Sequence, residues 1–133
     1  TASIAGIGPH KGIAPYVATK YAVVGISETL HEEREELGIG CSVLCPGNVQ
    51  TQIVAAGRNR QDTVGGPDHR INKQVQAQIS QGMDPMEVGR IVRQAVIDED
   101  LYIFTHSDTR EIAQTRFDAI LAAFDKCSAR GSS

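Results

Sequence analysis

Two residues that can together move a proton, Tyr16 and Lys20, stand four positions apart in the segment PYVATK. Residues four apart share one face of a helix, so the ammonium group of Lys20 can lie near the phenol of Tyr16. A phenol is a poor acid or base at neutral pH, but a neighbouring cation stabilises the phenolate. Such a pair can give a proton to a carbonyl oxygen or take one from an alcohol. Tyrosine and lysine also occur four apart on many surface helices, so the pair alone is weak evidence.

Two further features are predicted at the same edge of a sheet. Ser3 lies at the end of a predicted strand, where α/β sheets place ligand-contacting side chains. The sequence PGNVQT follows the next predicted strand: Pro46 and Gly47 turn the chain and expose backbone groups of Val49 and the hydroxyl of Thr51. A strand-end serine or a Pro-Gly turn is by itself usually structural. The polar, glycine-containing segment that follows is placed where a lid over a site would belong.

The expected elements alternate between strands and helices, which is typical of a parallel sheet covered by helices. Pro15 suits the first turn of the first helix, Gly38 can end it with a positive φ, and Asp84 is the expected N-cap of a later helix with Glu87 three residues on. Ser107 or Asp108 is the expected cap of the last helix. In chain order the elements are a strand ending in TASIAG, a helix from Tyr16 to Leu37, a strand in CSVLCPGNV, a helix over 69–81, a helix in DPMEVGRIVRQAVIDED, a strand in LYIFTH and a helix in SDTREIAQTRFDAILAAF.

Composition bounds the classes of function. The chain has 133 residues, of which 41% are hydrophobic, and a net charge of −3, so neither nucleic acid nor an anionic membrane is an expected partner. No apolar run reaches the ~18 residues that a bilayer span needs, and cytoplasmic residence is the default expectation. The histidines and cysteines lack metal-ligand spacing, so no metal site is expected. Cys41, Cys45 and Cys127 are expected to be buried free thiols.

Taken in order, Ser3-x-Ala5-Gly6, Tyr16-x-x-x-Lys20 and a strand ending Pro46-Gly47-x-Val49-x-Thr51 resemble the short-chain dehydrogenase/reductase family. The resemblance covers essentially all of residues 1–133. It implies the C-terminal half of a Rossmann-like doubly wound parallel sheet, incomplete without upstream strands, with a substrate loop at about 48–82 and a frayed tail at about 127–133. The PGNVQT ending resembles the simple alcohol/ketone oxidoreductases of the family.

The resemblance also implies roles for the residues that carry it. Ser3 would position and polarise the substrate oxygen, Tyr16 would exchange the proton, and Lys20 would stabilise ionised Tyr16 and hold the nicotinamide ribose hydroxyls. Pro46 and Gly47 would shape a turn against the nicotinamide. Val49 would meet its carboxamide through backbone groups, and Thr51 would hydrogen-bond the carboxamide or the pyrophosphate side. The implied reaction is hydride transfer between NAD or NADP and a small alcohol or ketone.

The glycine-rich turn that binds the dinucleotide is not found in this sequence, since Gly65-Gly66 follows no predicted strand. We therefore expect the chain to be a piece of a longer, active oxidoreductase and to be inactive alone. The alternative is a non-catalytic, oligomer-forming remnant of the dehydrogenase scaffold that cannot bind cofactor. Because LYIFTH would form an apolar sheet edge, a homo-oligomer, a dimer or tetramer, is expected.

Overall fold

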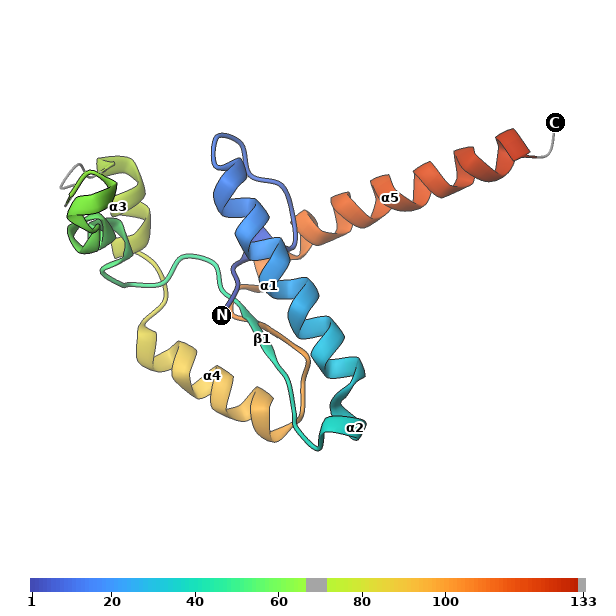
Figure 1. The fold of residues 1–133 in the computed structure, drawn as a ribbon, viewed down its shortest axis with the longest axis horizontal. Coiled ribbons are helices and arrows are strands. Elements are labelled where there is room, and N and C mark those ends of the chain that lie inside the picture. The colour runs from blue at the N-terminus through green and yellow to red at the C-terminus, as the bar shows by residue number, and fades with distance from the viewer. Residues whose placement is uncertain (67–71, 132–133) are drawn as a thin grey trace. The chain divides into compact units, whose positions relative to one another are not determined.

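The computed structural model describes residues 1–66 and 72–131, which form two compact units (Figure 1). Thr1–Gly47 together with Ala95–Ser133 make the first unit, and Asn48–Gln94 make the second. The elements in chain order are η1 (Ile4–Gly6), α1 (Ala14–Glu32), α2 (Arg34–Leu37), β1 (Val43–Cys45), η2 (Ile53–Asn59), η3 (Asp62–Val64), α3 (Lys73–Ser80), α4 (Pro85–Ile97), β2 (Tyr102–Phe104), η4 (Ser107–Thr109) and α5 (Arg110–Gly131), where η marks a 3-10 helix. The mixed α/β fold with a parallel sheet is confirmed.

The sheet pairs β1 with β2 in parallel, with Cys45 and Phe104 as register partners. The N-terminal residues run along the other side of β1, because the Ala2 N–H donates to the Leu44 carbonyl at 2.8 Å and the Ile4 N–H to the Pro46 carbonyl at 3.0 Å. A parallel ladder would add a bond from residue 46 back to Ala2, but proline has no N–H. The predicted strand end is therefore present as an extended segment that is hydrogen-bonded through its own N–H groups.

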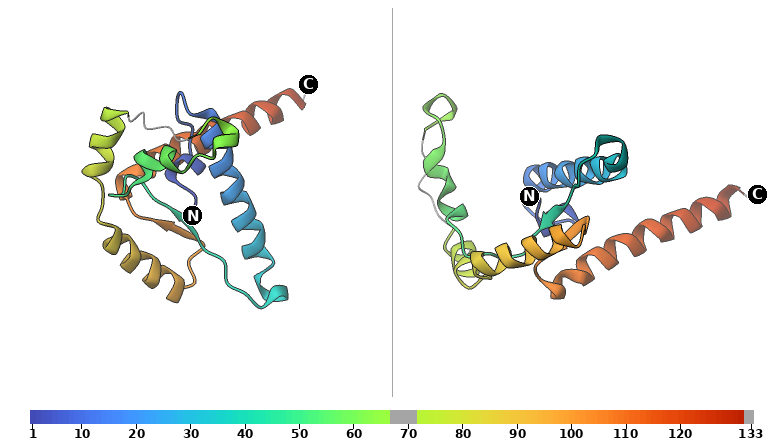
Figure 2. Two further views of the ribbon diagram at one scale, coloured as in Figure 1. Left: turned by 60° about the vertical axis from the view of Figure 1, so that its left-hand side comes forward. Right: turned by 90° about the horizontal axis from the view of Figure 1, so that it is seen from below.

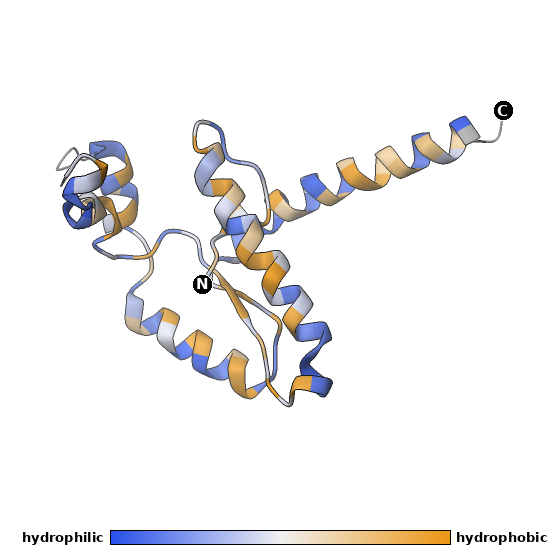
Figure 3. Cartoon of the chain, viewed as in Figure 1, coloured by the Kyte–Doolittle hydropathy of each residue, from blue (hydrophilic) through white to orange (hydrophobic). Residues whose placement is uncertain are grey.

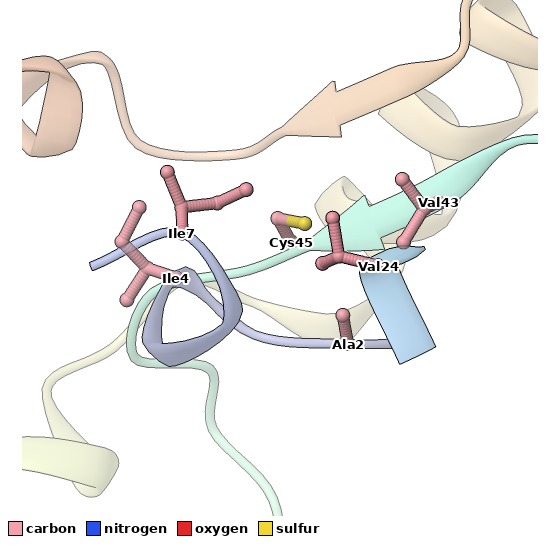
Figure 4. Packing of buried hydrophobic residues seen from close by; sticks show 6 residues of the cluster. All are labelled: Ala2, Ile4, Ile7, Val24, Val43 and Cys45. Carbon is pink, nitrogen blue, oxygen red and sulfur yellow. The ribbon is translucent and has the colours of Figure 1, made fainter. Parts of the chain in front are cut away.

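The core of the first unit lies between β1, α1 and the N-terminal segment (Figure 4). Val43 and Cys45 are each 1% exposed, and Val24 of α1 packs against them. Ala2, Ile4 and Ile7 close the cluster from the N-terminal side. Burial raises the pKa of the Cys45 thiol. The expectation of buried thiols is right for Cys45 and wrong for Cys41, which is only partly buried, and for Cys127, which is exposed on α5.

The helix that carries Tyr16 begins at Ala14, with Pro15 in its first turn as predicted. It was expected to run to Leu37, but α1 ends at Glu32 and a short α2 follows. The break falls at Glu33, with φ −83° and ψ −1°, whose N–H bonds to both His31 and Thr29 carbonyls. Gly38 then ends α2 with φ 65°, which confirms the predicted left-handed cap.

The second unit begins where the chain leaves the Pro46–Gly47 turn. Two backbone hydrogen bonds join the start of this unit to the residue Met83. The Met83 N–H donates to the Asn48 carbonyl at 2.9 Å, and the Gln50 N–H donates to the Met83 carbonyl at 3.0 Å. The predicted cap of α4 is confirmed, since Asp84 Oδ1 accepts the N–H of Met86 at 2.6 Å. The helix expected over 69–81 is α3, which begins after Asn72; residues 69–71 lie outside the described residues.

The last helix differs from the prediction at both ends. Ser107 and Asp108, the expected caps, lie in the preceding turn η4, and α5 begins at Arg110. The segment 127–131, expected to fray, continues α5, and Ser128 Oγ donates to the Phe124 carbonyl within it. Both views of Figure 2 show the end of α5 running away from α1 and β1. Figure 3 shows hydrophobic positions, coloured orange, along α5. Phe117, Ile120, Leu121 and Phe124 of this helix are exposed.

Among the residues that the structure describes, no helix combines the length and the apolar character that crossing a bilayer requires.

Candidate active site

Ser3 stands where the extended N-terminal segment turns into η1. Its backbone is extended, with φ −174° and ψ 164°, and its Oγ accepts the N–H of Ala5 at 3.2 Å. The side chain is half-buried. A serine hydroxyl has one hydrogen and two acceptor positions, so accepting from Ala5 leaves its own hydrogen to donate elsewhere.

Lys20 links Tyr16 to the backbone beside Ser3. Its Nζ lies 5.5 Å from the centroid of the Tyr16 ring, which confirms that the two side chains share one face of α1. The same Nζ donates to the Thr1 carbonyl at 3.3 Å. Tyr16 is 38% exposed, so its ring is open to a molecule that approaches from solvent. The structure therefore brings Tyr16 and Lys20 to the segment that carries Ser3.

Gly6 permits this approach of α1 to η1. A Cβ built on Gly6 would lie 2.7 Å from the Lys20 carbonyl oxygen and 2.9 Å from Val24 Cγ2. Contacts that short do not occur for real side chains, so only glycine fits without a shift of the helix backbone. Sequence reasoning noted Gly6 as part of a motif but not this contact, which depends on the packing of two elements.

Pro46 and Gly47 follow β1 at the same end of the sheet. The Pro46 carbonyl accepts the Ile4 N–H, so this turn is bonded to the segment that holds Ser3. Gly47 donates its N–H to Thr105 Oγ1 at 3.4 Å. Thr105 and its neighbour His106 follow β2, and sequence reasoning assigned neither of them to the site. A polar pair directly after a strand was the available signal.

Val49 and Thr51 belong to the second unit. Val49 forms a parallel bridge with Met83, and Thr51 is exposed. Thr51 lines a cavity of about 330 Å³ with Gln50, Gln52, Val54, Gln76, Ile79 and Ser80. Within its own unit, then, Thr51 lies at a hollow of mixed polar and apolar lining.

An aromatic cavity of about 450 Å³ lies in the first unit, on another face of α1. The Tyr102 hydroxyl donates to the Glu28 carboxylate in its wall, and the Arg116 guanidinium lies 5.1 Å from the centroid of the Tyr21 ring. Burial, then the hydrogen bond and the charge of Glu28, raise the pKa of Tyr102 to about 12.

This shift predicts a loss of stability at alkaline pH. A group whose pKa is raised by folding, here from 10.0 to about 12, contributes stability that is fully present below pH 10 and lost as the pH rises towards 12. We expect Tyr102→Phe to flatten this part of the stability curve, measured by urea unfolding at several pH values. Glu28→Gln should keep part of the effect, because burial is the largest cause. An unchanged curve in Tyr102→Phe would contradict the assignment.

The comparisons with known proteins point to one family. Residues 1–62 match the family model described as short chain dehydrogenase. The C alpha-dehydrogenase of Sphingobium sp. strain SYK-6 is 29% identical over 126 residues, covering 90% of this chain and 41% of that protein. The 3beta-hydroxysteroid dehydrogenase 2 of Eggerthella lenta is 42% identical over 53 residues, covering 40% of this chain and 20% of that protein.

The fold has solved counterparts. A short chain dehydrogenase/reductase from Burkholderia phymatum, determined in complex with NAD, matches with a TM-score of 0.82 and 28% identity over 92% of this chain and 47% of its own. The chain spans less than half the length of each of these three proteins. Sequence and fold together place it in one group: the chain belongs to the short-chain dehydrogenase/reductase family.

Proposed function

We propose that this chain is part of an NAD(P)-dependent oxidoreductase that interconverts a secondary alcohol and a ketone, with Tyr16 as the acid and base. One observation carries the proposal. The Lys20 ammonium reaches both the Tyr16 ring and the Thr1 carbonyl, two residues before Ser3. One cation thus links the phenol to the extended segment that carries the Ser3 hydroxyl.

The three side chains divide the work on the substrate oxygen. Ser3 accepts from Ala5 and keeps its own hydrogen to donate to that oxygen. Tyr16 gives its phenolic proton to the oxygen when a ketone is reduced, and takes the proton back when an alcohol is oxidised. Lys20 places its positive charge beside the ring, near where negative charge develops while the proton is transferred.

The donor set fits a nicotinamide cofactor, which when bound supplies or accepts the hydride. An ammonium group has three hydrogens, and Lys20 uses one on the Thr1 carbonyl, which leaves two for ribose hydroxyls. We assign the nicotinamide ring to the Pro46–Gly47 turn. We assign the carboxamide to backbone groups of Val49 and to the Thr51 hydroxyl. The complex of the Burkholderia phymatum protein with NAD supports NAD(P) as the cofactor.

The class of substrate rests on the relatives. One is named a C alpha-dehydrogenase and another a 3beta-hydroxysteroid dehydrogenase. The second name describes a substrate that carries a hydroxyl group. Both names support an alcohol/ketone pair as the substrate of the whole protein.

The test is turnover by the whole protein with NAD or NADP and a panel of alcohols and ketones, followed by cofactor absorbance. We expect turnover by the whole protein and none by residues 1–133 alone. Calorimetric titration of NAD and NADP into both proteins distinguishes this proposal from the alternative, a non-catalytic scaffold that cannot bind cofactor. If the whole protein neither binds nor turns over cofactor, the non-catalytic scaffold is the better description.

We also propose a homo-oligomer. Tyr102 and Phe104 of β2 stack with their ring centroids 6.0 Å apart and are 40% and 43% exposed. An exposed strand with stacked rings favours association with a second chain. Light scattering of the purified protein measures its mass directly.

A further inference from the structure

The ends of β1 and β2 are joined by a side chain where their backbone ladder stops. Cys45 and Phe104 are the last register partners, so the next residues along each strand are Pro46 and Thr105. Proline cannot donate to the ladder. The N–H that follows, that of Gly47, bonds to the Thr105 hydroxyl at 3.4 Å.

Thr105 is built into this position. It is 8% exposed, and among the described residues it is the one buried polar side chain. Its Oγ1 lies 2.6 Å from Nδ1 of His106 as well as accepting from Gly47. A buried hydroxyl costs stability unless it is bonded, and here both neighbours bond it.

His106 fixes the shape of the turn from the other side. A Cβ built on Gly47 would lie 2.9 Å from both Cγ and Nδ1 of the His106 ring, so the ring packs directly over this glycine. The backbone of His106 is itself held, because its carbonyl accepts the Thr109 hydroxyl at 2.6 Å and the Thr109 N–H at 3.3 Å. The ring and the hydroxyl therefore clamp Gly47 from two directions.

We infer that Thr105 and His106 are positioning residues that hold the Pro46–Gly47 turn in the shape that receives the cofactor. The part that concerns the cofactor rests on the function proposed above. In this arrangement the residues after β2 influence the site through the turn after β1. Neither Thr105 nor His106 touches the reacting atoms.

The first test is amide hydrogen exchange at Gly47, measured by NMR on the whole protein. We expect Thr105→Val, which keeps the shape and removes the hydroxyl, to speed exchange at Gly47 about tenfold, and Thr105→Ser to restore protection. The Val43 N–H, which donates to the Leu101 carbonyl at 2.7 Å, is the internal reference and should not change. Thr115→Val, at an exposed position of α5, is the matched control. Equal exchange at Gly47 in wild type and Thr105→Val would overturn the inference.

A double variant tests the part that His106 plays. Gly47→Ala should lower the unfolding midpoint because the new methyl meets the ring, and His106→Ala should relieve that loss in the double variant. Additive losses would show that the ring does not confine Gly47.

The last readout is the dissociation constant for NAD or NADP in the whole protein. Thr105→Val should raise it several-fold and Thr105→Ser should leave it near wild type. A wild-type constant in Thr105→Val, despite faster exchange at Gly47, would overturn the link to the cofactor. If wild type binds no NAD(P), the proposed function fails, while the exchange experiment still decides whether the turn is held.

Discussion

Replacing Tyr16 by phenylalanine is expected to reduce kcat of the whole protein by about 10²- to 10⁴-fold, the usual contribution of one general acid–base group. The substitution removes only the phenolic hydroxyl. Tyr16 is exposed and lies within reach of the Lys20 ammonium, so the ring and its neighbours should stay in place. Cofactor affinity should therefore change little while turnover is lost, a split that separates proton transfer from binding.

Tyr21→Phe is the matched control for this experiment. Tyr21 lies on the same helix, and its ring contacts Arg116 on the side away from the proposed chemistry. The Arg116–ring contact does not need the hydroxyl, so kcat should remain near wild type. Steady-state kinetics with one active alcohol or ketone measures both variants, and circular dichroism checks their folding. Turnover by Tyr16→Phe at the wild-type rate would refute the proposed mechanism.

Replacing Gly6 by alanine should be among the most damaging single-methyl changes in the first unit. The new methyl would stand 2.7 Å from the Lys20 carbonyl oxygen, which belongs to the backbone of α1 and cannot move alone. Overpacking of this kind costs about 1–3 kcal/mol of unfolding free energy. Because relief requires α1 to move off η1, the bond from Lys20 to Thr1 should weaken as well.

Gly25→Ala provides a control with the same chemical change, placed on α1, the helix against which Gly6 packs. A Cβ at Gly25 meets nothing within 4 Å, so alanine should stabilise α1 by about 0.5–1 kcal/mol through its higher helix propensity. Urea unfolding of both variants gives the two free energies. A Gly6→Ala protein as stable as wild type would show that α1 and η1 are not in close contact.

Features that depend on a few neighbouring residues could be predicted from the sequence. The cap by Asp84, the left-handed Gly38 and both strands follow from local backbone preferences and apolar pattern. The four-residue spacing likewise sufficed to bring Lys20 to Tyr16. Each of these features depends on residues only a few positions apart, where the conformational preferences of the residues themselves dominate.

Features that depend on packing between distant segments could not be predicted. The bond from Gly47 to Thr105 joins residues 58 apart in sequence. The packing of the His106 ring over Gly47 has no counterpart in the sequence pattern around either residue. The expected single helix to Leu37 is interrupted at Glu33, within a run of charged residues that gives no sequence signal of the break. The last helix continues into the expected frayed tail because Ala129 and Arg130 are good helix formers that were counted as tail.

The long connection between β1 and β2 has an evolutionary consequence. These neighbouring strands are separated in sequence by the whole of Asn48–Gln94, a unit with its own internal bonds. For a flexible connection, doubling the number of residues adds only about 0.6 kcal/mol of loop-closure entropy. Insertions and deletions in 48–82 should thus leave the pairing of β1 with β2 almost unaffected. Descendants of this protein can therefore lengthen or shorten that segment while the sheet, the Tyr16 helix and the Gly47 turn are inherited unchanged.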